Sequence, residues 1–64
     1  GGNDGVMLYN LCCTYSLLGE AERAVEVFEQ SIAAGYGNYQ WARFDPDLAI
    51  IRDHPRFIAL MQGH

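Results

Sequence analysis

The sequence predicts an all-α protein in which an antiparallel helical hairpin is followed by two or three short capping helices. Across residues 6–34, apolar side chains recur every three or four positions, which is the spacing of a helix rather than of a strand. A glycine follows each of two such periodic segments, and two prolines divide the rest of the chain into shorter pieces. With 64 residues, the chain forms at most one domain.

The first helix is expected to run from Val6 to Leu18. Its apolar positions are Met7, Leu8, Leu11, Cys12, Tyr15 and Leu18. Asp4 is the expected N-cap, and Gly19 is the expected terminator because glycine adopts the left-handed conformation that ends many helices. The glycine-rich residues 1–5 are expected to form a flexible or artificially added N-terminal end.

The second helix is expected to run from Ala21 to Ala34 and to end at Gly35. Its apolar stripe consists of Ala21, Ala24, Val25, Phe28 and Ile32. Such a stripe along one face is typical of a helix that packs against a neighbour. Because the connection at Gly19 is so short, the two helices must pack as an antiparallel hairpin. The hairpin then covers residues 6–35.

Residues 36–64 are expected to form a helical cap. A short helix is predicted near residues 39–43, and two further helix starts follow it. Asp45 before Pro46 is one start signal, because an aspartate caps the first free N–H groups and a proline fits the first turn. Asp53 with Pro55 repeats that signal for the last helix.

The composition excludes several classes of partner. The chain has eight acidic residues and four basic ones, all arginine, and a net charge of −4. A nucleic-acid-binding or membrane-surface protein needs a basic patch, which this chain lacks, and no apolar run is long enough to span a bilayer. The adjacent Cys12 and Cys13 are expected to stay free thiols, since a bond between them would close almost no loop. Free thiols favour a reducing compartment, so the cytoplasm is the expected location.

Catalysis and metal binding both have weak support. Cys13 and His54 could form a nucleophile–base pair, but nothing in the sequence brings them together. The residues that could ligate a metal are Asp45, Asp47, Asp53 and His54. A calcium loop that began at Asp45 would need an acid or amide at Ala49 and a glycine at Ile50, and it has neither. We therefore expect helix caps and ion pairs here, no metal or cofactor, and no enzymatic activity.

The first part of the chain resembles one tetratricopeptide repeat (TPR), a helix–turn–helix unit of about 34 residues. The matching positions are Leu8, Leu11, Cys12, Tyr15, Gly19, Ala24 and Phe28. The resemblance implies that Cys12 and Ala24 face each other where the two helices approach closely. The sequence departs from the family pattern at Leu8, where the family prefers Trp, at Cys12, where it prefers Gly or Ala, and at Tyr36, where it prefers Pro.

The last part resembles the segment that closes TPR arrays in many bacterial regulatory and signalling proteins. The matching positions are Asp45, Pro46, Asp47, Leu48, Arg52, Pro55, Arg56, Phe57 and Leu60. The resemblance implies a cap over the apolar flank of the second helix, where another repeat would otherwise stack. The covering residues would be Trp41, Phe44, Leu48, Ile51 and Phe57.

The same resemblance implies a non-catalytic protein–protein interaction scaffold, whose first helix lines a concave groove for a peptide or a helix. The groove residues would be Val6, Tyr9, Asn10, Cys13, Ser16 and Leu17. The carboxylate clamp of the family does not carry over, because the first helix has no basic residue. Apolar surface would remain at Met7, Leu8 and Leu11, where a preceding repeat or, in the isolated chain, a second copy would pack.

Two other readings remain open. The aromatic residues between Tyr36 and Phe44 could form a cage for a small ligand, which would make the chain a regulatory or sensory module. The acidic residues of the second helix could be a docking patch for a basic partner, although a solvated face is the simpler expectation. These residues are Glu22, Glu26 and Glu29.

Overall fold

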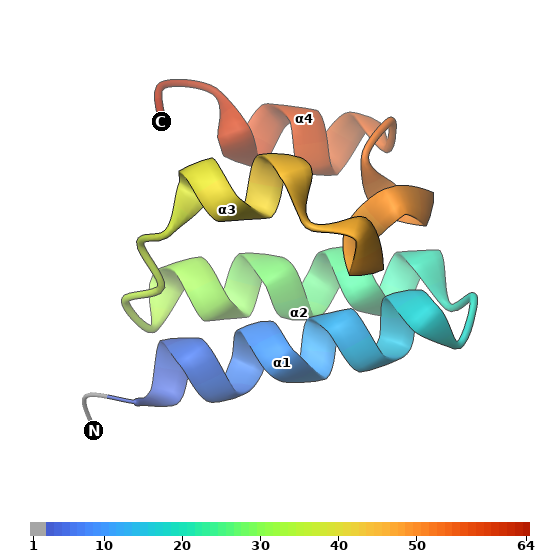
Figure 1. Ribbon diagram of the computed structural model, residues 1–64. Coiled ribbons are helices and arrows are strands. Elements are labelled where there is room, and N and C mark those ends of the chain that lie inside the picture. The colour runs from blue at the N-terminus through green and yellow to red at the C-terminus, as the bar shows by residue number, and fades with distance from the viewer. Residues whose placement is uncertain (1–2) are drawn as a thin grey trace.

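The computed structural model describes residues 3–64, which form helices joined by short turns and contain no strand. The elements are α1 (Asp4–Leu17), α2 (Ala21–Ala33), α3 (Tyr39–Phe44), the 3₁₀ helix η1 (Pro46–Ile51) and α4 (Pro55–Met61). In Figure 1, α1 and α2 run antiparallel as a hairpin, and α3, η1 and α4 lie on one side of it. The predicted all-α hairpin with short helices after it is confirmed. No helix within residues 3–64 could span a membrane.

Two glycines end the hairpin helices, as predicted. Gly19 has a φ of 81° and Gly35 a φ of 107°, a left-handed conformation that side chains strongly disfavour. Behind each glycine the chain folds back on the helix that it leaves. The N–H of Glu20 donates to the Tyr15 carbonyl, and the N–H of Tyr36 donates to the Ser31 carbonyl, each at 2.9 Å. These bonds satisfy carbonyls that a helix end would otherwise leave unpaired.

The contact between α1 and α2 is built on small side chains. Cys12 on α1 and Ala24 on α2 are both fully buried, and they belong to the same core cluster as the larger Val25 and Phe28 of α2. Cys12 therefore lies in the core, where the sequence predicted a small residue.

The N-terminal boundary differs from the prediction. Asp4 is the first residue of α1 rather than its cap, and Asn3 holds the cap position without a side-chain hydrogen bond. Gly5 is buried against the backbone of Tyr36. The first helix therefore begins at Asp4, two residues before the expected start at Val6, while residues 1 and 2 lie outside the described part of the chain.

The C-terminal segment covers both hairpin helices rather than α2 alone. η1 packs mainly against α1, and α4 packs against α2. Leu48 and Ile51 of η1 are fully buried, and the ring of Phe57 lies 4.9 Å from that of Phe28. Trp41 and Phe44 were expected to cover the core and do not, because α3 turns them outward and leaves them 49% and 71% exposed.

Helix starts in this segment occur where the two prolines predicted them. The Asp45 carboxylate accepts the N–H of Asp47 at 3.0 Å and so caps η1. The cap of α4 is His54 rather than Asp53, because its ring Nδ1 accepts the N–H of Arg56 at 3.1 Å. The side chain of Asn38 caps α3.

Candidate interaction surface

The predicted peptide groove is largely closed by the protein's own tail. Tyr9, Cys13 and Ser16 lie four and then three residues apart on one face of α1, and they are 5%, 8% and 2% exposed. The expectation that they line an open groove is therefore wrong. The physical reason is that η1 and the residue before it, Asp45, pack onto this face.

Polar contacts hold the tail on this face. The Asp45 carboxylate, which is 4% exposed, accepts the O–H of Tyr9 at 2.5 Å and the S–H of Cys13 at 3.7 Å. Ser16 donates its hydroxyl to the Asp47 carbonyl at 2.5 Å. A buried carboxylate is stable only when hydrogen bonds replace the lost water, and α1 supplies two of the donors. Asp45 thus has a second role beyond that of a helix cap.

This cluster does not favour cysteine catalysis. Burial, with the nearby charges of Asp45 and Asp47, raises the pKa of the Cys13 thiol to about 11. Burial also raises the pKa of Cys12 to about 12. Since the thiolate is the nucleophile, neither thiol is activated at neutral pH. Both ring nitrogens of His54 have other partners, because Nε2 lies 2.8 Å from a carboxylate oxygen of Glu22 and Nδ1 accepts the N–H of Arg56.

The same cluster has the donor atoms of a metal site. The thiol of Cys13 and carboxylate oxygens of Asp45 and Asp47 lie within 4.8 Å of one another. However, both carboxylate oxygens of Asp45 already accept protein hydrogen bonds, one from Asp47 and the other from Tyr9 and Cys13. A metal would have to displace bonds that fix the tail, so we interpret the cluster as a structural anchor.

The other three predicted groove residues form an exposed edge of α1. Val6 and Leu17 are 51% and 68% exposed, and Asn10 is also exposed. The tail does not cover this edge. The structure therefore divides the predicted groove into a buried row and an exposed row.

The predicted stacking residues do lie together on an open surface. Met7, Leu8 and Leu11, with Ala34 from the end of α2 and Asp4 at the rim, line a groove of about 550 Å³. Met7 is 65% exposed and Leu11 is 42% exposed. We refer to this surface as the α1 groove.

Of the acidic residues of α2, two contact residues at the start of α4. A carboxylate oxygen of Glu22 lies within hydrogen-bonding distance of the His54 Nε2, at 2.8 Å, and Glu29 forms an ion pair with Arg56. All three glutamates are nevertheless exposed, as the sequence suggested, and the Glu22 side chain is 84% exposed. A docking patch for a basic partner is therefore less complete than the sequence implied, because the protein itself supplies two of the partners.

The aromatic residues between Tyr36 and Phe44 do not converge on one cavity. Tyr36 is buried and stacks on Tyr9, with ring centroids 4.2 Å apart. Tyr39 stacks on the ring of His64 at 3.8 Å, while Trp41 and Phe44 face outward. The arrangement does not form the aromatic cage that the alternative reading requires.

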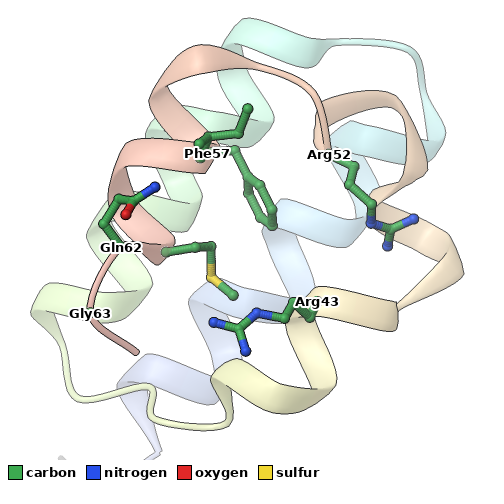
Figure 2. A pocket seen from close by; sticks show the side chains of 7 residues that line it. Arg43, Arg52, Phe57, Gln62 and Gly63 are labelled. Atoms are coloured by element: carbon green, nitrogen blue, oxygen red, sulfur yellow. The ribbon is translucent and has the colours of Figure 1, made fainter.

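Sequence reasoning missed a second cavity, which lies in the C-terminal segment. It has a volume of about 340 Å³, and the residues that line it include Arg43, Arg52, Phe57, Ile58, Met61 and Gln62. In Figure 2 the Phe57 ring lies between Gln62 on one side and Arg52 on the other, with Arg43 below it. We refer to it as the arginine pocket. The two arginines come from separate short elements, so no spacing in the sequence marks them as neighbours.

Comparisons with known proteins give limited further information. No protein-family model matches the chain, and no solved structure matches it. The chain is similar to a chloroplastic protein of Arabidopsis thaliana, with 32% identity over 57 residues. The match covers 89% of this chain but only 17% of that protein. The relative's length is thus mostly outside the similarity, and its activity does not transfer.

Proposed function

We propose that the chain is a non-catalytic protein–protein interaction module that closes a TPR-type array and uses the α1 groove as its binding surface. The observation that carries the proposal is the groove itself. Met7 and Leu11 are exposed next to each other on one face of α1. The opposite face of the same helix is buried against the rest of the hairpin and the tail. Exposed contiguous apolar surface of this kind is typical of protein–protein contacts.

The shape of the groove favours a helix as the occupant. Its apolar side chains are spaced three and four residues apart along α1 and so form a ridge-and-groove surface that a second helix can fill. Burying a large apolar side chain contributes about 1.5–3 kcal/mol, so Met7 and Leu11 alone supply a sizeable driving force. In an array the occupant would be the second helix of a preceding repeat, and in the isolated chain it would be a second copy.

The TPR assignment is supported by the helix contact as well as by residue spacing. Cys12 and Ala24, the small residues of the pattern, are both fully buried in the hairpin core. Because the tail covers the face of α1 that the sequence predicted as the concave groove, the proposed binding surface lies on another face of this helix. A peptide there would have to displace Asp45 from Tyr9 and Cys13, which would leave a buried carboxylate without its partners. We keep the cytoplasm as the proposed compartment on the basis of the two free thiols.

Sedimentation equilibrium over a wide concentration range tests the proposal. The wild-type chain should self-associate, and Leu11→Glu should remain monomeric because it places a charge in the middle of the α1 groove. Leu17→Glu is the matched control, since Leu17 lies on the same helix, is 68% exposed and is outside the groove. It should associate like the wild type.

Two results would contradict this function. One is a wild-type chain that stays monomeric at every concentration with a concentration-independent melting temperature. The other is an equal loss of association in Leu11→Glu and Leu17→Glu, which would mean that added charge rather than the groove controls association.

A further inference from the structure

We propose that the partner at the α1 groove is a second copy of this chain, whose α1 packs antiparallel against α1 of the first copy in one fixed register. The inference rests on the proposed function, because it names the occupant of the same surface. It goes further, since it extends the contact beyond the groove to Thr14 and Leu18 and gives the contact an orientation.

The first argument is an exposed stripe that runs the length of α1. Its members are Met7, Leu11, Thr14 and Leu18, which follow one another at steps of four, three and four residues. Leu18 continues the helix with αR backbone angles, and it is 68% exposed, close to the 65% of Met7. Alternating steps of four and three residues are the spacing of a coiled-coil seam, in which two helices cross at about 20° and keep one stripe in contact. The stripe is therefore suited to contact with another helix along its full length.

The second argument is that the stripe is complementary to itself. In a twofold symmetric contact the same surface serves both copies, so that a residue i meets a residue j and j meets i. When two α1 helices run antiparallel about an axis between residues 12 and 13, Met7 lies opposite Leu18 of the second copy. In the same register Leu11 lies opposite Thr14 of the second copy. Large side chains then meet at both ends of the contact, and the smaller Thr14 leaves room for Leu11 at the centre.

The third argument is that the stripe can be buried without leaving a polar group unsatisfied. Thr14 is the polar member of the stripe, and its hydroxyl donates to the Asn10 carbonyl of the same helix at 3.1 Å. Burying a hydroxyl is costly when it loses its hydrogen bond, and this hydroxyl keeps its partner inside its own helix. The contact therefore gains apolar burial without that cost.

The fourth argument is charge. The chain has a net charge of −4, yet residues 5–18 contain no charged side chain. Two copies can therefore meet along α1 without burying a charge. At each end of the contact Asp4 comes near Glu20 of the second copy, and Arg23 lies 3.6 Å from that carboxylate and offsets its charge. The remaining repulsion acts between exposed charges, which physiological salt screens.

Disulfide trapping tests the orientation and the register. Met7→Cys is mixed with a mass-labelled Leu18→Cys, and the mixture is left to exchange and is then oxidised mildly. It should give a covalent heterodimer, because positions 7 and 18 face each other. Either variant alone should give almost none, since its two added thiols lie about 16 Å apart along the helix axes, at about 1.5 Å per residue. The native thiols should not react, because Cys12 is fully buried and Cys13 is 8% exposed.

Sedimentation equilibrium distinguishes a failure of this inference from a failure of the proposed function. Leu18→Glu should weaken association by at least about tenfold, although Leu18 lies outside the groove, because by symmetry the change removes an apolar contact at both ends. Leu17→Glu places the same charge on a different face of α1 and should associate like the wild type.

The outcomes separate the two claims. If the wild type associates and Leu11→Glu does not, but Leu18→Glu associates like the wild type, the groove has a different occupant and this inference is overturned while the proposed function stands. A covalent dimer from Met7→Cys alone, or no heterodimer in an associating mixture, would also overturn it. A wild-type chain that stays monomeric would overturn both claims.

Discussion

Replacing Gly5 with alanine should destabilise the protein, although alanine is the better helix former. Gly5 lies in the first turn of α1, and a Cβ built there would be 2.5 Å from the Tyr36 nitrogen and 3.0 Å from the Tyr36 Cα. Both neighbours are backbone atoms in the turn after α2, so no side chain can rotate out of the way. The start of α1 or the turn at Gly35 must move.

Two opposing effects set the magnitude. In an exposed helix position, alanine would stabilise by about 0.8–1 kcal/mol relative to glycine. Overpacking at a tight contact costs about 1–3 kcal/mol, and the rigid backbone at Tyr36 places this site toward the upper part of that range. The net expectation is a loss of about 1–2 kcal/mol in the free energy of unfolding.

Urea denaturation followed by circular dichroism measures this difference. Gly37→Ala is the matched control, because its Cβ would meet nothing closer than the Gly35 carbonyl oxygen at 3.9 Å. It should be neutral or stabilise slightly, through the unfolded state. If Gly5→Ala were as stable as the wild type, the close packing of α1 on the turn at Tyr36 would be wrong.

Three further predictions concern the buried cluster and the core. Tyr9→Phe removes a donor to the buried Asp45 carboxylate and should cost about 1.5–3 kcal/mol in urea denaturation, whereas Tyr39→Phe should change stability by less than about 0.5 kcal/mol. The pKa values of Cys12 and Cys13 are raised in the folded state, so the unfolded chain loses these protons first and stability must fall as pH rises. The fall in stability should begin near pH 8.5, where the thiols of the unfolded chain ionise. It should reach up to about 1.4 kcal/mol per pH unit for each thiol, until the pH passes the folded pKa values of about 11 and 12. Equal stability in urea titrations at pH 7, 9 and 10 would refute this prediction. Cys12→Ala should be tolerated in a thermal melt, whereas Cys12→Leu should cost about 1–3 kcal/mol, and equal tolerance would mean that the helices do not meet there.

Local signals were enough to predict the elements of the fold. The ends of the hairpin helices depend on Gly19 and Gly35, and a left-handed glycine is a property of a few neighbouring residues. The starts of η1 and α4 depend on Pro46 and Pro55 in the same way. Such features can be read from one sequence because their physical causes act within a single turn.

The packing of the tail could not be predicted because its causes act over long distances in the chain. Tyr9 and Asp45 are 36 residues apart, and each has an obvious local explanation, as a groove residue and as a helix cap. One carboxylate oxygen of Asp45 does cap η1, but the other accepts bonds from α1. Nothing in the local sequence distinguishes a cap that faces water from a cap that is also buried.

The same limit explains the exposed aromatic residues. Trp41 and Phe44 are the most apolar residues of α3, so hydrophobicity alone places them in the core. The structure buries the small Ala42 of this helix instead, because α3 is too short to turn more than a narrow face inward. Leu48 and Ile51 of η1 then fill the space over α1.

The two anchors of the tail have a consequence for binding at the α1 groove. The Asp45 cluster holds η1 on the inner face of α1, and the contacts of Glu22 with His54 and of Glu29 with Arg56 join α4 to α2. None of these contacts involves a residue that lines the groove, although Tyr9 and Cys13 lie on the same helix as most of those residues. A helix that docks at Met7 and Leu11 therefore meets a surface whose backbone is already held from behind, at little further cost in conformational entropy. The tail thus covers the inner face of α1 and leaves the groove on the opposite face open, so that a partner helix can bind to an α1 that the tail already holds in place.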